Sequence, residues 1–305
     1  MAEGPLAPHP MLFDRALLRR RRRRAAGLGP ATFLLDRVAG EFAERLAAVL
    51  RRFDLAVDLG TPGEALRTAL AGLGSVGSIV RAYRGAGDGA IRVKSFVAAD
   101  EEALPFADAT LDLVVSALAL QFVNDLPGVL VQIRRALKPD GLFLAALMGG
   151  ETLTELRQSF AAAESEMEGG ASPRVAPFAD LRELGALLQR AGFALPVTDV
   201  DRLTVRYDSA FGVIRDLRRM GATNALLARR RTPLRRATLM RMAEIYAKRF
   251  ADEDGRVRAT FEIVWLSGWA PDPSQQQPLK PGSAKTRLAD AFGVREISTG
   301  DKAGR

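Results

Sequence analysis

The 305-residue sequence contains no cysteine and a single histidine, His9. The absence of cysteine excludes disulfides, thiolate nucleophiles and sulfur-ligated metal sites. His9 lies in a proline-rich leader, where it is a poor candidate for catalysis or metal ligation. Any chemistry must therefore come from carboxylates, amides, hydroxyls, arginines or a cofactor, and we predict no metal site.

Long apolar runs are also missing. No segment reaches the ~20 apolar residues that are needed to cross a bilayer, and the basic stretch near the start is not followed by the apolar core and cleavage site of a secretory signal. The start is arginine-rich like a mitochondrial presequence, but Glu3 and Asp14 argue against one. We expect a cytoplasmic protein in a bacterium, or one on the mitochondrial matrix side in a eukaryote.

Positive charge is present in excess, with a net charge of +8. It is concentrated in the run Arg19–Arg24 and in a second cluster, Arg229–Arg231 with Arg235 and Arg236. The first interpretation of each cluster is a solvated helix face. The second is contact with an acidic partner, or peripheral membrane contact through Arg19–Arg24. Nucleic acid is disfavoured as a partner because no aromatic residues alternate with the arginines.

Short apolar runs alternate with helical or turn segments in the first half of the chain. They cover residues 55–59, 76–80, 91–97, 111–116 and 142–147. Such an alternation predicts βαβ units around a parallel sheet. The segment that follows, 150–250, is predicted to be largely helical, with short strands at 194–206 and a last strand at 260–265.

These patterns predict an α/β protein with a doubly wound sheet and a helical insertion. We divide the chain into a basic, helical N-terminal segment, a sheet core, a mainly helical substrate or partner region, a final sheet strand and a polar, flexible tail. Their predicted ranges are 1–52, 53–148, 149–258, 259–270 and 271–305.

Three spacing patterns predict helix N-termini. Residues 61–64, TPGE, fit a capping box in which the threonine is the N-cap and the glutamate reaches back from the third helical position. Asn124 is predicted to cap the helix that precedes the fifth apolar run. Thr152 and Glu155 have the spacing of another capping box.

Longer motifs carry a resemblance to a known superfamily. AVDLGTPGEAL, AADEEALPF and LVVSALALQFVNDLP, in that order, resemble class I S-adenosylmethionine (SAM)-dependent methyltransferases. Together with MLFDRALLRRRRRRAA, KPDGLFLAALMGGETLTELR, EGGASP, LGALLQRAGF, DLRRMGATN and EDGRVRATFEIVWLSGW, they resemble the methyltransferase-fold assembly factors of respiratory complex I, whose mitochondrial form is an arginine hydroxylase. This likeness covers residues 11–285. ALALQF and TLTELRQSF resemble, less fully, the malonyl-carrier-protein methyltransferase of biotin synthesis.

The resemblance implies a Rossmann-like sheet of seven mostly parallel strands with the ligand at their carboxyl ends. It also implies SAM as the cofactor, a respiratory complex I subunit as partner, and methylation or hydroxylation of an arginine as the activity. A non-catalytic assembly chaperone of the same fold, or malonyl-carrier-protein O-methylation, are the alternatives. No catalytic residue is assigned. In the helical region Arg157 and Arg174 are candidates to meet a substrate carboxylate.

The first motif of the superfamily is kept in part. Asp58 and Gly60 match its acid and its first glycine, and both are predicted to bind the cofactor. Pro62 and Glu64 stand where the superfamily has further glycines. Those glycines let the backbone approach the cofactor closely, and proline has no amide N–H to donate.

The second motif departs further. The superfamily places an acid after the second strand, where it accepts hydrogen bonds from the ribose hydroxyls. This sequence has Arg81, Ala82 and Arg84 around that position. Arginine cannot accept a hydrogen bond, and its charge would repel the cofactor's sulfonium. The arginine is interpreted either as a solvated strand end or as part of a site for a different, anionic ligand.

The third and fourth motifs supply the remaining predicted cofactor contacts. Asp100 is expected to accept from the adenine amino group, and Glu101 to form the pocket wall. Ser116 and Gln121 would line the floor that faces the substrate. Gln121 stands where the hydroxylase-type proteins carry histidine, and the biotin-pathway enzyme has glutamine there. Glutamine is not a general base.

Overall fold

The computed structural model describes residues 11–84, 95–276, 283, 290 and 292–294. The chain divides into two compact units, Met1–Pro271 and Asp272–Arg305. Every helix and strand named below belongs to the first unit.

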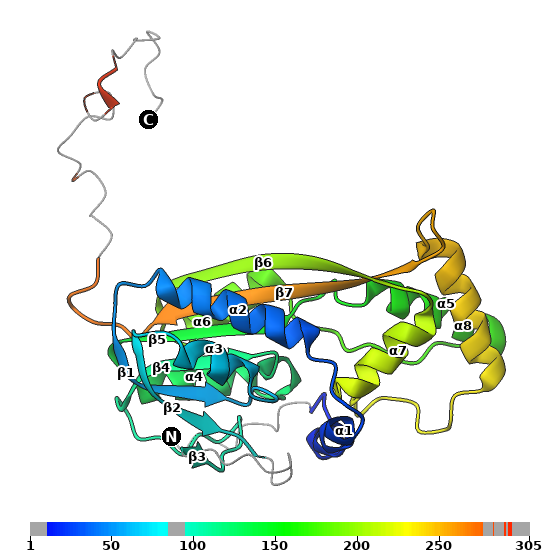
Figure 1. The fold of residues 1–305 in the computed structure, drawn as a ribbon, viewed down its shortest axis with the longest axis horizontal. Helices are drawn as coiled ribbons and strands as arrows, with labels where there is room; N and C mark the ends of the chain where they lie inside the picture. The colour runs from blue at the N-terminus through cyan, green and yellow to red at the C-terminus, as the bar shows by residue number, and fades with distance from the viewer. Residues whose placement is uncertain (1–10, 85–94, 277–282, 284–289, 291, 295–305) are drawn as a thin grey trace, which may run out of the picture. The chain divides into compact units, whose positions relative to one another are not determined.

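A single seven-stranded sheet runs through the first unit (Figure 1), in the order β3-β2-β1-β4-β5-β7-β6. Neighbours from β3 to β5 pair in parallel, whereas β7 pairs antiparallel with both β5 and β6. The predicted doubly wound, mostly parallel sheet of seven strands is confirmed. The strands are β1 (Phe53–Leu59), β2 (Val76–Ala82), β3 (Phe96–Val97), β4 (Leu111–Ala117), β5 (Leu137–Met148), β6 (Ala194–Tyr207) and β7 (Val257–Trp269).

Helices cover both faces of this sheet (Figure 1). Helices α2 and α3 share one apolar core with one face of the central strands, and α4 and α6 share a second core with the other face. Helices α5, α7 and α8 extend the first core along β7. The helices are α1 (Arg15–Gly27), α2 (Phe33–Ala47), α3 (Ala65–Ala71), α4 (Leu126–Ala136), α5 (Thr154–Glu168), α6 (Leu181–Arg190), α7 (Ala210–Arg219) and α8 (Arg236–Phe250), with a 3₁₀ turn at Leu120–Phe122.

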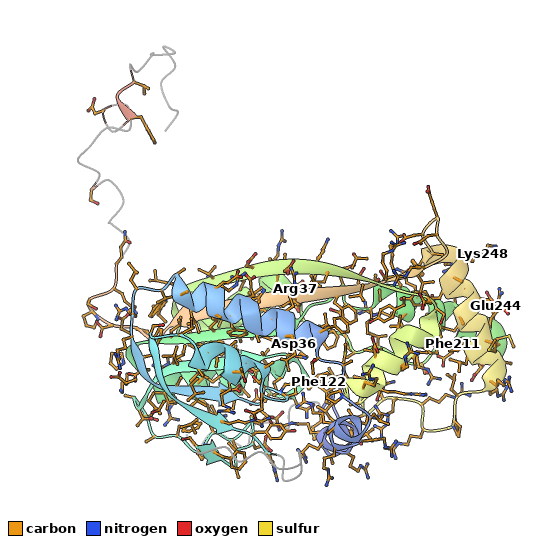
Figure 2. All side chains as sticks on the ribbon, in the orientation of Figure 1. Asp36, Arg37, Phe122, Phe211, Glu244 and Lys248 are labelled. Carbon is orange, nitrogen blue, oxygen red and sulfur yellow. The ribbon has the colours of Figure 1, made fainter. Side chains whose placement is uncertain are left out.

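Helix α2 illustrates how the apolar periodicity builds the fold. Its buried side chains recur at helical spacing and face the sheet, where the ring of Phe42 packs against Trp265 with centroids 5.0 Å apart. Asp36 and Arg37 lie on its exposed side (Figure 2). Arg45 adds a cation–π contact 4.4 Å above the Trp265 ring. The amphipathic pattern thus fixes which face of α2 is buried.

The last two strands are longer than the sequence predicts. Strand β6 is one strand of 14 residues at the edge of the sheet, where short strands were expected, and β7 has 13 residues. The predicted helical region therefore contributes an edge strand to the sheet. Part of the predicted strand 91–97 lies outside the described residues, and the remainder forms β3. In the part of the chain that the structure describes, no helix is long and apolar enough to cross a membrane.

Candidate functional site

The turn after β1 lies at the carboxyl end of the sheet, where ligands bind in open α/β folds. Gly60 adopts φ +71°, and a Cβ on it would lie 2.9 Å from Cγ of Glu101 and 3.2 Å from Cβ of Ala119. Only glycine fits this position without displacing its neighbours. In the superfamily the glycine at this position lets a ligand approach the backbone. Here the side chain of Glu101 lies against Gly60 instead.

The capping box predicted over residues 61–64 is wrong. Thr61 is fully buried, and its Oγ1 accepts a hydrogen bond of 2.9 Å from the backbone N–H of Ala117, at the end of β4. Helix α3 begins only at Ala65, with Glu64 at its N-cap and no side-chain cap bond. The threonine satisfies a buried amide of the sheet, which leaves it unavailable to the helix.

Arg81, at the position of the superfamily's ribose acid, is buried with 2% of its surface exposed. Its Nη1 lies 3.0 Å from Oε1 of Glu64, and its Nη2 donates to the carbonyl of Thr61 at 3.1 Å. The guanidinium also lies 4.9 Å from the ring centroid of Tyr83. The interpretation as a solvated strand end is wrong, because this arginine joins β2 to the first turn from inside the protein.

Asp58 is paired in register with Arg81 across β1 and β2 and is only 1% exposed. Among the described residues, neither of its carboxylate oxygens has a partner at hydrogen-bond geometry. Burial raises the pKa of Asp58 to about 7, although the Thr61 hydroxyl and the charge of Arg81 oppose the shift. This carboxyl is therefore close to its own midpoint of ionisation at neutral pH.

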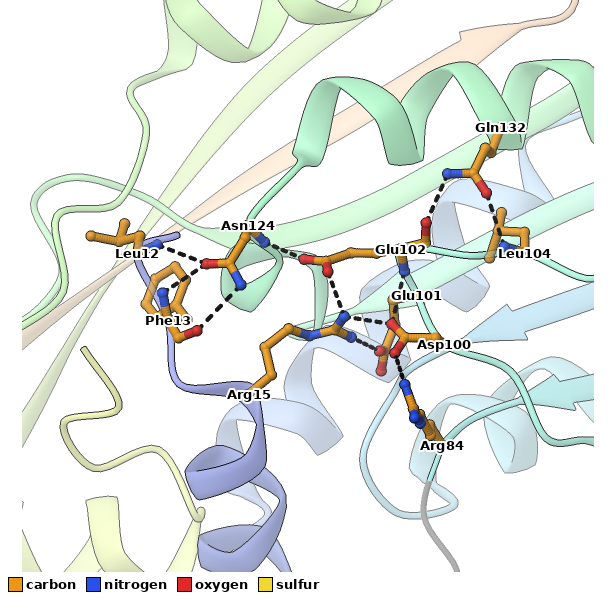
Figure 3. Close-up of polar contacts among 10 residues, drawn as sticks. All are labelled: Leu12, Phe13, Arg15, Arg84, Asp100, Glu101, Glu102, Leu104, Asn124 and Gln132. Atoms are coloured by element: carbon orange, nitrogen blue, oxygen red, sulfur yellow. Dashed lines mark hydrogen bonds and ion pairs between the residues drawn. The ribbon is translucent and has the colours of Figure 1, made fainter. Parts of the chain in front are cut away.

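The acidic segment 100–102 is bound by an arginine that sequence reasoning did not single out (Figure 3). Arg15, the first residue of α1, pairs through its guanidinium with Asp100, with Glu101 and, at 2.8 Å, with Glu102. Arg84 pairs with the other oxygen of Asp100. In the sequence, only the position of Arg15, directly after Asp14 and ahead of the run Arg19–Arg24, could have indicated this contact.

Asp100 is held in its ionised form by these partners. Burial raises its pKa, but the backbone N–H of Glu102 and the guanidinium groups of Arg15 and Arg84 outweigh burial and lower it to about 2. Both of its oxygens accept hydrogen bonds from the protein. The predicted acceptor for adenine is therefore already occupied by the chain itself.

Asn124 holds the segment before α1 in place, which corrects its predicted role as a helix cap. Its Oδ1 accepts from the backbone N–H groups of Leu12 and Phe13 at 2.8 and 2.7 Å, and its Nδ2 donates to the Phe13 carbonyl at 3.2 Å (Figure 3). Asp125 caps α4 instead, accepting from the N–H of Gly128 at 2.9 Å. Asn124 and Arg15 together fix the start of α1 over the carboxyl end of the sheet.

The two predicted floor residues lie in different environments. Ser116 is fully buried and donates its hydroxyl to the carbonyl of Leu59 at 2.7 Å, so it joins β4 to β1. Gln121 lines an apolar cavity, and its Oε1 is buried without a hydrogen-bond partner in the described structure. Of the two, only Gln121 is placed to meet a ligand.

The two arginines proposed to meet a substrate carboxylate are both engaged within the protein. Arg157 donates through Nη2 to the carbonyls of Gly150 and Thr152, at 3.0 and 3.2 Å. Arg174 donates through Nε to Glu164 at 2.7 Å. Arg157, on α5, fixes the turn before that helix, and Arg174 ties the segment after α5 back to it.

The capping box predicted at Thr152 and Glu155 is also wrong. The Thr152 hydroxyl and the backbone of Glu262 exchange two hydrogen bonds of 3.1 Å each. Glu155 accepts from the N–H and the hydroxyl of Thr260, at 3.0 and 2.5 Å. Thr152 attaches the turn before α5 to β7, and Glu155 attaches α5 itself to β7.

Comparison with known proteins places this site in a family. Residues 78–145 match the model of a methyltransferase domain. Arginine-hydroxylase NDUFAF5, mitochondrial, of Danio rerio is 39% identical over 298 residues, which cover 94% of this chain and 92% of that protein. The protein of the same name from Homo sapiens is 39% identical over 304 residues, 96% of this chain and 87% of that protein. The chain belongs to the NDUFAF5 family.

Two further likenesses are less extensive. A malonyl-[acyl-carrier protein] O-methyltransferase of Laribacter hongkongensis is 40% identical over 191 residues, 63% of this chain and 62% of that protein. The crystal structure of a putative methyltransferase from Bacillus halodurans superposes with a TM-score of 0.51 at 17% identity, covering 76% of this chain and 98% of that one. At that identity the superposition shows a common fold and no more.

The residues at the carboxyl ends of β1 to β3 do not fit SAM. A close approach to Gly60 is blocked by Glu101, and Arg81 places a buried cation where a ribose acid would stand. The adenine acceptor, Asp100, is engaged by Arg15 and Arg84. Arginine offers only donors, so the groups that SAM needs as acceptors are absent or already bonded. Among the described residues, no group of three histidine, cysteine or acidic side chains could hold a metal ion.

Proposed function

We propose that this member of the NDUFAF5 family is an assembly factor that works by binding its partner, a respiratory complex I subunit, and not by SAM-dependent chemistry. The observation that carries the proposal is the ion pair of the buried Arg81 with Glu64, 3.0 Å apart, at the position of the superfamily's ribose acid. The complex I subunit as partner comes from the family resemblance.

Energetics support this choice over a cofactor-dependent enzyme. Admitting SAM requires that Arg81 leave Glu64 and that Arg15 leave the acidic segment 100–102. Breaking each of these partly buried pairs costs roughly 1–3 kcal/mol because a charged group loses its hydrogen-bonded partner.

A basic face suited to an acidic partner is available on α1. No hydrogen bond or ion pair within the described residues engages the side chains of Arg19, Arg20, Arg23 and Arg24. Helix α1 is fixed at its start by Arg15 and by Asn124, so these arginines are presented on a rigid element. Charge complementarity of this kind gives fast and specific association.

Malonyl-carrier-protein O-methylation is the second candidate. It is favoured by the 40% identity to the enzyme from Laribacter hongkongensis and by Gln121, which stands where the biotin-pathway enzyme has glutamine. Growth of a biotin-requiring methyltransferase mutant that carries this chain would support the second candidate and overturn the first.

The proposal is tested by capture of complex I subunits. A tagged chain, expressed in its source organism, is purified with and without added SAM, and the captured subunits are quantified by mass spectrometry. We expect the same subunits in equal amounts under both conditions. Replacing Arg19, Arg20, Arg23 and Arg24 by serine should reduce capture at least tenfold, whereas Arg235→Ser with Arg236→Ser, the matched control, should leave it unchanged. Capture that requires SAM, or transfer of labelled methyl groups to a captured subunit, would overturn the proposal.

A further inference from the structure

A cavity of about 490 Å³ adjoins the first turn and Gln121. Its walls come from the α1–α2 segment, the first turn, the ends of β4 and β5, and the end of α7. The volume is in the range of small-molecule sites in proteins. Most of the lining is apolar and includes Leu34, Leu35, Leu118, Leu153 and Phe261.

Among the described residues, no aspartate or glutamate lines this cavity, and few polar side chains do. Two of the polar residues are already engaged: the Thr32 hydroxyl donates to Asp36 at 2.7 Å, and the Thr152 hydroxyl is bonded to the backbone of Glu262. The groups that remain available to a ligand are arginine and amide side chains. The cavity is therefore apolar in its body and positive in its charge.

Arg22 supplies that charge. Its guanidinium lies 5.6 Å from the ring centroid of Phe122, which lies near α1 in Figure 2. No carboxylate among the described residues pairs with it. Its backbone is fixed because α1 is pressed against Gly221, where an added Cβ would lie 2.8 Å from the Arg22 Cα. A half-buried cation that is held in place and has no carboxylate partner is suited to bind the anionic group of a ligand.

The second arginine of the lining reinforces the field. Arg219 donates through Nε to the carbonyl of Gly29 at 2.7 Å, and the nearest carboxylate, that of Asp216, is 3.7 Å away. Gln121 also lines the cavity, and its Oε1, buried without a partner in the described structure, is an acceptor that suits a donor group of a ligand. The two arginines thus give positive charge to an otherwise apolar space.

We propose that this cavity binds a single acyl chain that ends in an anionic group, with the anion at Arg22 and the chain against the apolar walls. This ligand is not part of the function proposed above. An arginine side chain is a poor occupant, because its guanidinium would meet two other arginines and no carboxylate. A free fatty acid and an anionic lipid share the chemistry that the cavity recognises.

The first test is calorimetric titration of the full chain with dodecanoate, dodecanol and dodecyltrimethylammonium, each below its micelle concentration. We expect dodecanoate to bind best. Arg22→Ala should weaken dodecanoate binding at least tenfold and leave dodecanol binding unchanged. Arg23→Ala, one residue along the same helix and outside the cavity, is the matched control and should behave like the unaltered chain. Equal dodecanoate affinity in the Arg22→Ala and Arg23→Ala variants, tighter binding of the cationic amphiphile, or no binding of any of the three would overturn the proposal.

A second variant separates the cavity from the basic surface of α1. Ala31→Phe adds a ring to the cavity wall and should abolish binding of both dodecanoate and dodecanol, with an unchanged circular dichroism spectrum. Vesicles of phosphatidylglycerol and mass spectrometry of the ligand co-purified from cells then distinguish a membrane lipid from a free fatty acid. If the Ala31→Phe variant still binds dodecanoate or vesicles, the ligand attaches to the surface of the protein. That result would contradict binding inside the cavity.

Discussion

The two ends of the groove above the sheet differ in how they use charge. At the cofactor end, Arg15, Arg81 and the acidic segment 100–102 pair with one another or with Glu64, and they fill the space with their own side chains. A few residues away, the cavity beside Gln121 keeps about 490 Å³ of space and an unpaired arginine. The comparison teaches that a retained fold can close one ligand site with a few charged residues while it leaves the adjacent one open.

The largest stability effect is expected at Arg81. Arg81→Ala removes the ion pair with Glu64, the hydrogen bond to the Thr61 carbonyl and the contact with Tyr83, so it should lower the free energy of unfolding by roughly 3 kcal/mol, although Glu64 keeps its pair with Arg67. Arg81→Met combined with Glu64→Gln should recover most of that loss, since both charges are then removed. Urea unfolding measures the difference. A loss below ~1 kcal/mol would mean that the pair does not hold the first turn.

Arg15 should rank second. Arg15→Ala removes the cation shared by Asp100, Glu101 and Glu102, and we expect a loss of roughly 2–3 kcal/mol together with faster proteolysis of α1. Arg20→Ala, on the same helix and without a partner among the described residues, should change stability by less than ~0.5 kcal/mol. Similar losses in the two variants would contradict the assigned role of Arg15.

Asp58 gives a pH-dependent test. Its folded pKa of about 7 lies above the unfolded value of 3.8, so the folded state binds the extra proton between these values. The stabilisation that this carboxyl contributes is fully present below pH 4 and is lost as the pH rises through 7. Because Asp58→Asn cannot ionise, it lacks this loss. The free energy of unfolding of the variant, relative to that of the unaltered chain, should therefore rise by roughly 2–4 kcal/mol from acidic to alkaline pH. Thermal melts at pH 5 and pH 8 measure it, and parallel pH profiles would refute the raised pKa.

The smallest effect is expected in the cavity. Gln121→Leu removes an amide whose Oε1 has no partner in the described structure, so it should be neutral or should stabilise the protein by up to ~1 kcal/mol. Ser116→Ala, which breaks the buried bond to Leu59, is the contrasting control and should cost ~1 kcal/mol. A larger loss at Gln121 than at Ser116 would reveal a partner for the amide.

The sheet could be predicted from sequence because its signals are local and repeated. Buried strands of a parallel sheet appear as short apolar runs, and the helix α2 shows its own period. The length of β6 could not be predicted, because half-exposed edge positions resemble turns and polar segments until their pairing with β7 is known.

The polar side chains of the site were harder to predict for one reason. Thr61, Asn124 and Thr152 each have the spacing of a local helix cap, yet each bonds to a segment far away in the chain. Short-range spacing shows which bonds are possible, and tertiary packing decides which are made. Arg81 is the same case, since nothing near it in sequence indicates its pair with Glu64.

The central claim is that the cofactor end of the groove is closed by the protein itself, and calorimetric titration with SAM tests it most directly. We predict no saturable binding to the unaltered chain at millimolar SAM. The combined variant Pro62→Gly, Glu64→Gly and Arg81→Glu, which restores the glycines and the ribose acid, should gain measurable affinity. Micromolar binding of SAM to the unaltered chain would contradict the account.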